Sequence, residues 1–357
     1  MIKLEHGDCL ELLKLLPDNF VDSIVTDPPY GLEFMNKKWD KGIPSVDVWA
    51  ECLRVLKPGG YLLAFAGTRT QHRMACNIED AGFDIKDMIA WLYGSGFPKS
   101  MNISKQIDKT LGCTPIDTGK SKRTNSRKAR QNGELVGSVS VEELKYVPIT
   151  APSSDKAKEW DGWGTALKPA IEPITVARKP HKGTIANNVL KHGVGGLNID
   201  ACRAARFPAN LVHDGSDEVL ELFPKNAGAR AKVKGSEPSN LTNNCYNQMN
   251  RGEGVFYGDK GSAARFFYCA KASPSERNLG MPDGQKNVHV TVKPISLARW
   301  LIKLVTPVGG TTIDPFLGSG SMGVAAIHEN MNFIGFEIEK ESFDTARYRI
   351  NHAKSLK

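Results

Sequence analysis

The sequence has 357 residues, yet no run of apolar residues in it reaches the length of a transmembrane helix. Its first residues, Met1–Glu5, lack the apolar stretch of a secretory signal peptide. The seven cysteines include no Cys-x-x-Cys pair, which argues against a zinc site and against a disulfide scaffold. We therefore expect a cytoplasmic protein with reduced thiols, without a membrane partner and without a bound metal.

The net charge is negative over the first 98 residues and strongly positive over the next 38. The whole sequence carries a net charge of +8, but residues 1–98 sum to −4 and residues 99–136 to +6. A positive excess favours a polyanionic partner without identifying it. The densest basic stretch has almost no apolar residues and is predicted to be a mobile loop; a solvated surface loop and a phosphate-contacting loop both stay open. Its basic residues are Lys120, Lys122, Arg123, Arg127, Lys128 and Arg130.

Short apolar stretches alternate with helical patterns at both ends of the chain. Near-continuous apolar strands separated by amphipathic helices are typical of a parallel sheet covered on both faces. Between these ends, residues 99–285 are richer in Gly, Pro, Asn and basic residues and show no regular alternation. The helix predicted over 49–56 is expected to stop at Lys57-Pro58-Gly59-Gly60. The predicted strands are 2–4, 21–25, 61–66, 171–177, 265–270, 311–313 and 333–336, and the predicted helices are 10–16, 49–56, 295–305, 321–329 and 343–353.

A glycine-rich loop, Gly318-Ser319-Gly320-Ser321-Met322-Gly323, follows a predicted strand and opens a predicted helix. Glycines let a backbone approach a ligand closely, and the acid that ends the next strand, Glu337, can accept hydrogen bonds from ribose hydroxyls. The pattern therefore indicates a cofactor that contains a nucleoside. No Gly-Lys-Ser/Thr follows the loop, so it is not a P-loop.

NAD is the obvious cofactor for such a loop, and an NAD-binding oxidoreductase is therefore one alternative. Two observations oppose it. Only 34 residues follow Gly323, too few for the rest of a dinucleotide-binding fold. Asp314 also ends the preceding strand, where a carboxylate suits the amino group of a methionine-like ligand better than it suits a pyrophosphate.

A second motif, Asp27-Pro28-Pro29-Tyr30, directly follows a predicted strand. Its two prolines fix φ and cannot donate hydrogen bonds, so the turn is rigid. The carboxylate of Asp27 and the carbonyl oxygen of Pro28 can both accept hydrogen bonds from an exocyclic amino group, while the ring of Tyr30 can stack on a base. The alternative is a rigid surface turn that carries an exposed tyrosine.

Together the two motifs resemble those of the amino-methyltransferases of DNA, which carry an (Asp/Asn/Ser)-Pro-Pro-(Tyr/Phe/Trp) turn and a Phe-x-Gly-x-Gly loop. Phe316-Leu317-Gly318-Ser319-Gly320 matches the loop, and His6–Cys9 and Thr291–Pro294 match further segments of the family. The catalytic turn precedes the cofactor loop, as in the β group. The resemblance implies an α/β, Rossmann-like methyltransferase fold with a mostly parallel, doubly wound sheet, a circularly permuted motif order and an inserted target-recognition region.

The resemblance also divides the chain into parts. Residues 1–98 and 286–357 would form the N-terminal and C-terminal parts of the catalytic domain. Residues 99–285 would form the inserted region, with a core strand near 167–178. The closing helix, 343–353, would lie beside the first strand. Four acids would lie on successive strands, namely Asp314, Glu337, Asp8 and Asp27.

Roles for individual residues follow from the same resemblance. The catalytic residues would be Asp27, Pro28, Pro29 and Tyr30. The cofactor, S-adenosyl-L-methionine, would contact Asp8, Cys9, Asp27, Thr291, Lys293, Asp314, Phe316, Gly318, Ser319, Gly320, Glu337 and Ile338. The DNA backbone would contact Lys120, Lys122, Arg123, Arg127, Lys128 and Arg130, and residues 243–251 would read base edges.

The implied reaction is the direct transfer of a methyl group to the exocyclic N6 of adenine in double-stranded DNA, with the target base flipped out of the helix. The same chemistry on cytosine N4 stays open, although Asp27 rather than a serine favours adenine. The absence of a Pro-Cys pair argues against methylation of cytosine C5 by a cysteine nucleophile. A catalytically inactive DNA-binding module is the remaining alternative. A homodimer and a partner restriction endonuclease are implied by the resemblance alone.

Overall fold

The computed structural model forms two compact units, one made of residues 1–95 and 170–357 and the other of residues 96–169. No helix in the described part of the chain has the length and apolar character that crossing a bilayer requires. The described residues are 1–32, 42–96, 98, 100–123, 146–204, 206–227, 261–270, 275–287, 289 and 291–357, with the backbone alone described for 121–123, 146 and 147.

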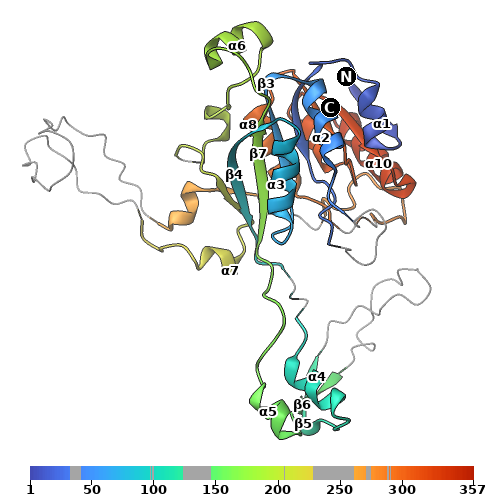
Figure 1. Cartoon of the computed structure of the whole chain (residues 1–357), viewed down its shortest axis with the longest axis vertical. Helices are drawn as coiled ribbons and strands as arrows, with labels where there is room; N and C mark the ends of the chain where they lie inside the picture. Colours follow the sequence, from blue (N-terminus) through green and yellow to red (C-terminus); the bar gives the residue numbers. More distant parts are fainter. Residues whose placement is uncertain are drawn as a thin grey trace, which may run out of the picture. The chain divides into compact units, whose positions relative to one another are not determined.

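The larger unit is built around one nine-stranded sheet (Figure 1). In sheet order its strands are β1 (Ile2–His6), β11 (Asn332–Glu337), β10 (Thr311–Asp314), β2 (Val21–Thr26), β3 (Leu56–Phe65), β7 (Ile171–Arg178), β4 (Asp84–Leu92), β8 (Leu211–His213) and β9 (Tyr268–Cys269). Strand β7 runs antiparallel to both of its neighbours, β3 and β4, whereas the other pairs are parallel. The prediction of a mostly parallel sheet is therefore confirmed.

Helices cover both faces of this sheet. One layer contains α1 (Cys9–Lys14), α2 (Val46–Val55) and α3 (Gln71–Asp80), and the other contains α8 (Ile295–Val305), α9 (Ser321–His328) and α10 (Lys340–Ser355). The outer strands are joined through α6 (Ile185–His192), α7 (Asp217–Leu220) and the 3-10 turns Asp200–Cys202 and Ala263–Phe266.

Successive residues of the central strands enter two different hydrophobic cores. In β3, Leu62 and Ala64 pack towards α1–α3, whereas Leu63 and Phe65 pack towards α8–α10. All four side chains are fully buried. Because both faces of the strand are covered, both sets of positions must be apolar, which explains the near-continuous apolar runs in the sequence.

The N-terminal and C-terminal segments of the chain pair with each other inside the sheet. Strand β10 pairs in parallel with β2, placing Ile313 opposite Ile24, and β11 and β1 follow on the far side of β10. The predicted permuted order is thus confirmed, and the four acids come from the successive strands β1, β11, β10 and β2. Helix α10 lies beside β1, as predicted, with the rings of Phe343 and His6 5.5 Å apart. The strand order reverses between β10 and β2, and open α/β sheets bind ligands at such a point.

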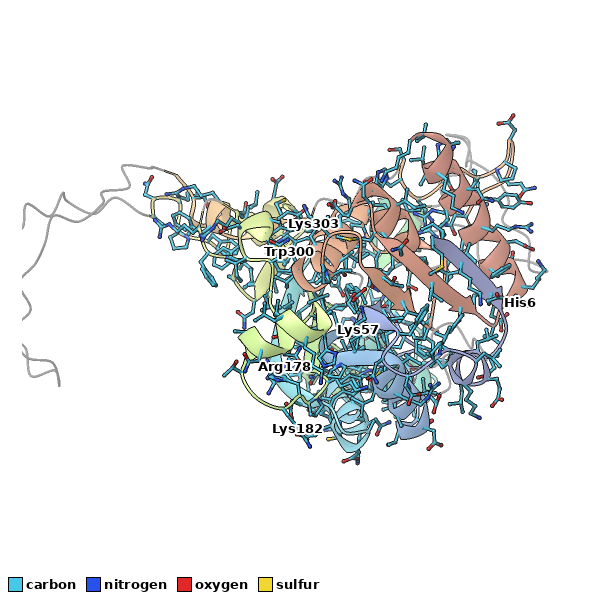
Figure 2. All side chains as sticks on the ribbon, turned by 90° about the horizontal axis from the view of Figure 1, so that it is seen from above. His6, Lys57, Arg178, Lys182, Trp300 and Lys303 are labelled. Atoms are coloured by element: carbon cyan, nitrogen blue, oxygen red, sulfur yellow. The ribbon has the colours of Figure 1, made fainter. Side chains whose placement is uncertain are left out.

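At the edge of the sheet where β2 and β10 begin, the carboxylate of Asp22 joins two neighbouring strands. Lys57 Nζ, labelled in Figure 2, lies 2.6 Å from Asp22 Oδ1, while Asp22 Oδ2 accepts a 2.7 Å hydrogen bond from the Thr311 amide. The predicted end of the helix before Lys57 is confirmed, because α2 ends at Val55, whereas the strand predicted from Tyr61 begins earlier, at Leu56. The strand continues because Gly59 donates to the Lys179 carbonyl, and Lys179 to that of Gly60.

The outermost strand is shorter than its sequence indicates. A strand was expected over 265–270, but residues Ala263–Phe266 form a 3-10 turn and only Tyr268–Cys269 form β9. The Ser262 hydroxyl accepts a hydrogen bond from the Ala264 amide and caps that turn, which competes with an extended backbone.

The smaller unit contains α4 (Ile103–Thr110), α5 (Asp155–Glu159) and the antiparallel pair β5 (Ile116–Arg123) and β6 (Tyr146–Ala151). Asp108 joins the two helices, because its buried carboxylate accepts hydrogen bonds from the Ser153 amide, the Ser154 amide and the Ser154 hydroxyl. These bonds lower the pKa of Asp108 to about 2.

Candidate active site

Asp27 lies directly beyond the carboxyl end of β2, at the point where the strand order reverses. Its half-buried side chain is held from two sides. Asp27 Oδ2 lies 2.6 Å from Lys293 Nζ, and Asp27 Oδ1 accepts a 2.7 Å hydrogen bond from the Tyr30 hydroxyl. Pro28 and Pro29 fill the turn between these residues, so Asp27 and Tyr30 are presented by a rigid backbone.

Tyr30 uses its hydroxyl inside this cluster. Besides Asp27, the hydroxyl has a second acceptor, Glu172 Oε2, at 3.1 Å, and the Tyr30 carbonyl accepts a 2.7 Å hydrogen bond from the Thr70 hydroxyl. Burial, followed by the two nearby carboxylates, raises the pKa of Tyr30 well above its usual value. The hydroxyl is therefore a neutral donor at physiological pH, which the sequence pattern did not suggest.

Lys293 is the cation at the centre of the site, with 6% of its side chain exposed. Its ammonium contacts Asp27 and, at 3.2 Å, Glu172 Oε2, and it lies 5.0 Å from the centre of the Phe65 ring. Burial alone would lower the pKa of Lys293, but the charges and hydrogen bonds of the two carboxylates outweigh it and raise that pKa. The resemblance assigned Lys293 to the cofactor; in the structure its ammonium contacts Asp27 and Tyr30.

Glu172 was not predicted to be a functional residue. It lies near the start of β7, and because β7 is antiparallel, its start meets the same edge of the sheet as the carboxyl ends of the parallel strands. The neighbouring Pro173 carbonyl accepts a hydrogen bond from Ala66, just beyond the end of β3. Strand direction carries no signal in the local sequence, which explains why Glu172 was missed.

Asp314 ends β10 next to the turn Asp27–Tyr30 and is almost fully buried. Asp314 Oδ1 accepts a 2.6 Å hydrogen bond from the Thr26 hydroxyl and a 3.1 Å hydrogen bond from the Phe316 amide. Burial raises the pKa of Asp314 to about 7, although both hydrogen bonds act in the opposite direction. A ligand ammonium next to this carboxyl group would favour its ionised form.

Glu337 at the end of β11 holds the glycine loop. Glu337 Oε2 accepts a 2.7 Å hydrogen bond from the Gly318 amide, and Oε1 accepts a 2.8 Å hydrogen bond from the Glu339 amide. Burial raises the pKa of Glu337. The adjacent Ile338 is exposed, and the half-buried ring of Phe316 lies 6.2 Å from that of Trp49.

The glycine loop requires its glycines. Gly318 and Gly320 have φ values of +52° and +80°, a region that favours glycine, and a Cβ on Gly320 would lie 3.0 Å from Ala346. At Gly323 a Cβ would lie 2.4 Å from Ile350 Cδ1, so this position lets α9 pack closely on α10.

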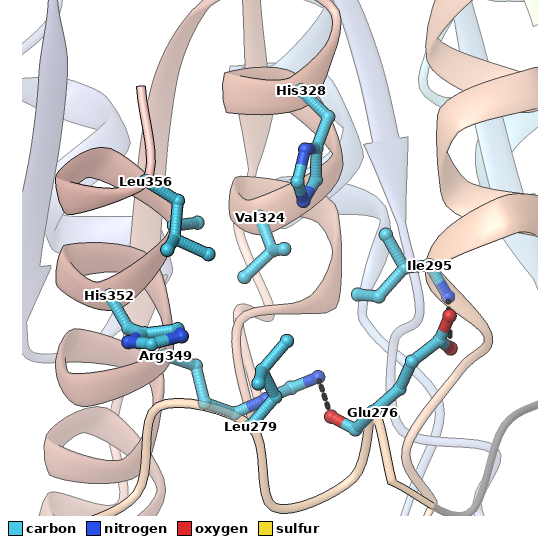
Figure 3. Close-up of a pocket in the computed structure, with 9 residues that line it drawn as sticks. Glu276, Leu279, Ile295, Val324, His328, Arg349, His352 and Leu356 are labelled. Atoms are coloured by element: carbon cyan, nitrogen blue, oxygen red, sulfur yellow. Dashed lines mark hydrogen bonds between the residues drawn. The ribbon is translucent and has the colours of Figure 1, made fainter.

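Arg349 of α10 binds the same loop through hydrogen bonds to Ser319. Its buried guanidinium donates to the carbonyl of Ser319 at 2.6 Å and to the hydroxyl of Ser319 at 3.0 Å. It also donates to the Glu276 carbonyl at 3.3 Å, beside a small pocket among α8, α9 and α10 (Figure 3). Arg349 has no motif that would have singled it out, because only the packing of α10 brings it to the loop.

Asp8 and Cys9 begin α1 at the end of β1. Asp8 is exposed, and its Oδ1 accepts a 2.8 Å hydrogen bond from the Leu10 amide, which makes Asp8 the N-cap of the helix. Burial raises the pKa of Cys9 to about 12, so this thiol stays protonated. Thr291 is half-buried, two residues before Lys293.

The residues at this edge fit S-adenosylmethionine. Carboxylates at the ends of successive strands can accept hydrogen bonds from ribose hydroxyls and from an ammonium group, and the glycine loop leaves the backbone open to close approach. The groups concerned are Asp8, Glu337, Asp314 and the loop 318–320. A pyrophosphate would be repelled by the same set of carboxylates, which argues against a dinucleotide.

Three of the predicted DNA-contacting residues belong to the antiparallel strand pair of the smaller unit. Lys120 is exposed on β5, and the backbones of Lys122 and Arg123 belong to the same strand. The mobile loop expected here is therefore wrong for residues 120–123, because backbone pairing with β6 organises even a polar strand. Arg127, Lys128, Arg130 and residues 243–251 lie outside the described residues.

Most of the chain matches the model of a known protein family. The family model described as a DNA methylase matches residues 21–347. Type II methyltransferase M.HindIII of Haemophilus influenzae is 23% identical over 98% of this chain and 95% of its own length, and M.BglI of Bacillus subtilis is 25% identical over 94% and 81%. The crystal structure of the M1.HpyAVI-SAM complex is 20% identical, covers 98% of this chain and 100% of that chain, and has a TM-score of 0.45.

Proposed function

Because the chain belongs to the N6/N4 family of DNA methylases, whose methyl donor is S-adenosylmethionine, we propose that it methylates the exocyclic N6 of adenine in double-stranded DNA. The observation that carries this proposal is the position of Asp27, an immobilised hydrogen-bond acceptor on a double-proline turn at the ligand-binding edge. An aspartate at the first position of the turn supports adenine over cytosine by the family pattern.

The chain's own residues act by positioning. Asp27 Oδ1 and the Pro28 carbonyl accept hydrogen bonds from the target amino group, which orients the nitrogen lone pair for in-line attack. Tyr30 offers the flipped base a ring to stack on. Lys293 holds Asp27 Oδ2, so the carboxylate does not have to be ordered when the base enters. When bound, S-adenosylmethionine supplies an electrophilic methyl group.

The cofactor contacts are part of this proposal. Asp314 would pair with the ammonium of the methionine part, Glu337 would accept from the ribose hydroxyls and Asp8 would contact the adenine. The other proposed contacts are Cys9, Asp27, Thr291, Lys293, Phe316, Gly318, Ser319, Gly320 and Ile338.

DNA recognition is proposed for the region between the two catalytic segments, residues 99–285. Its first part, up to residue 169, belongs to the compact unit 96–169, and the rest continues with the sheet of the larger unit. The basic residues from Lys120 to Arg130 would contact the backbone. Several relatives are named Type II methyltransferases, which supports the further proposal of a cognate restriction endonuclease; a homodimer is proposed from the family resemblance alone.

The purified chain, incubated with S-adenosylmethionine and unmethylated genomic DNA, should produce N6-methyladenine detectable by mass spectrometry of the digested nucleosides. N4-methylcytosine in its place would overturn the adenine assignment while leaving the family chemistry intact. D27A should abolish turnover even at saturating S-adenosylmethionine. A D27A variant with near-normal turnover would overturn the role of the catalytic turn.

A further inference from the structure

Two carboxylates compete for one hydroxyl at the catalytic turn. The Tyr30 hydroxyl lies 2.7 Å from Asp27 Oδ1 and 3.1 Å from Glu172 Oε2. A phenol has a single proton to donate, so a strong hydrogen bond to one carboxylate weakens the bond to the other. Without substrate, the shorter contact is the one to Asp27.

This arrangement leaves Asp27 occupied on both oxygens. Lys293 holds Oδ2, and the Tyr30 hydroxyl holds Oδ1, the oxygen assigned to the target amino group. The incoming amino group must therefore share or displace the hydroxyl. A displaced, buried hydroxyl without an acceptor would cost free energy, since buried polar groups need partners.

We propose that Glu172 is a positioning residue that accepts the Tyr30 hydroxyl when the target amino group takes its place on Asp27. The inference rests on the proposed role of Asp27 as acceptor for the amino group. It holds equally for adenine N6 and cytosine N4, because both are exocyclic amines. Glu172 touches neither the target nor the cofactor in this scheme.

The negative charge of Glu172 and the fixed position of its backbone suit it to this exchange. Its Oε2 lies 3.2 Å from the Lys293 ammonium, and a carboxylate paired with a cation can accept a hydrogen bond but has none to donate. Its backbone belongs to β7, which pairs with β3 and β4 on its two sides. The hydroxyl thus needs to move only a short way between two acceptors, and Lys293 Nζ lies 3.3 Å from the oxygen of Tyr30 beside them.

A purely structural role for Glu172, as a second counter-ion for Lys293, makes a different prediction. In that case the effect of removing its charge would not depend on the Tyr30 hydroxyl. Exchange of the hydroxyl requires both groups, so the two substitutions must be coupled. A double-mutant cycle separates the two roles.

The experiment measures single-turnover methyl transfer at saturating DNA and S-adenosylmethionine for the wild type, E172Q, Y30F and the double variant. E172Q should lower the rate about 10- to 100-fold, the range expected when a hydrogen bond to a charged group is lost. Its affinities for S-adenosylhomocysteine and DNA should stay within about 2-fold of the wild type, because Glu172 binds neither. In the Y30F background, E172Q should cost less than about 3-fold, since no hydroxyl remains to be moved.

E172D is the second variant, in case E172Q does not fold. It keeps the charge near Lys293 and shortens the side chain by one methylene, which withdraws the acceptor from the Tyr30 hydroxyl. E172D should lose rate in the wild-type background and not in the Y30F background. The matched control is E329Q, which removes a carboxylate paired with Arg299 at the surface of α8 and α9 and should leave the rate unchanged.

An equal loss from E172Q or E172D in both backgrounds, or no loss in either, would overturn the proposal. Failure of the proposed function looks different. In that event D27A would keep its activity, whereas failure of the exchange leaves D27A inactive and abolishes only the coupling between Tyr30 and Glu172.

Discussion

Lys293 and Asp27 form a buried ion pair 2.6 Å long between residues 266 positions apart in the chain. Lys293 precedes α8, on the C-terminal segment, and Asp27 follows β2, on the N-terminal segment. The pair thus connects the half of the fold that carries the catalytic turn to the half that carries the glycine loop. Glu172, on a third segment, shares the same ammonium.

Replacing Lys293 by methionine should destabilise the protein strongly. The side chain keeps its approximate volume, but two half-buried carboxylates lose their common buried cation; breaking a buried ion pair typically costs about 3–5 kcal/mol of unfolding free energy. Methyl transfer should also be lost, because Asp27 is no longer held. Denaturant unfolding and a turnover assay measure the two effects.

The control for that substitution is K340M, which breaks an exposed pair with Asp344. It should cost less than about 1 kcal/mol, as surface ion pairs usually do. Equal losses from K293M and K340M would contradict the special role of the buried pair.

Asp314 should make folding stability depend on pH in an unusual direction. Its pKa is raised to about 7, so between roughly pH 4 and 7 the folded chain keeps a proton that the unfolded chain has released. The unfolded state then binds fewer protons, and this contribution to stability falls as the pH rises through that window. Relative to D314N, the wild type should lose on the order of 4 kcal/mol between pH 4 and pH 8. Denaturant midpoints across this range test it, and a flat difference would refute it.

The same carboxyl group should link cofactor binding to proton release. If Asp314 pairs with the ammonium of S-adenosylmethionine, binding at pH 6.5 favours its ionised form and expels a proton. Calorimetry in two buffers of different ionisation enthalpy should detect this proton in the wild type and not in D314N. Equal proton release in both would assign it to another group.

Replacing Arg349 by methionine should loosen the glycine loop. The guanidinium donates to the carbonyl and the hydroxyl of Ser319, and its loss should raise the Kd for S-adenosylhomocysteine about 10- to 100-fold. R349K should be intermediate, because lysine keeps the charge without the planar fork of donors. R347M, on an exposed position of the same helix, should bind like the wild type. Unchanged affinity in a folded R349M protein would exclude this support.

Replacing Asp108 by asparagine should loosen the smaller unit. The carboxylate accepts three hydrogen bonds from Ser153 and Ser154, and its pKa is lowered to about 2. Its stabilising contribution is therefore complete above roughly pH 4 and declines as the pH falls towards 2. At pH 7, D108N should speed hydrogen exchange within residues 96–169. D155N, on the exposed start of α5, is the control; equal exchange in both variants would count against this role of Asp108.

Local patterns determined much of the fold in advance. Apolar strands alternating with amphipathic helices indicated a covered parallel sheet, and the two motifs placed Asp27 and Gly318 at the ends of strands. Such features can be read from the sequence because periodicity, proline and glycine act on their immediate neighbours. The order of the four acids was predicted only in part: Asp314, Glu337 and Asp8 follow one another as the motif order implied, but Asp27 lies beside Asp314 and not beside Asp8.

The tertiary structure decided what surrounds the catalytic turn. Glu172 reaches Tyr30 only because β7 runs against its neighbours, and Arg349 reaches Ser319 only because α10 packs on α9. The sequence determined by itself which backbone segments would meet at the ligand-binding edge. Strand direction and helix packing decided which side chains contact Asp27 and Lys293. Such contacts join residues more than a hundred positions apart and therefore leave no local pattern in the sequence.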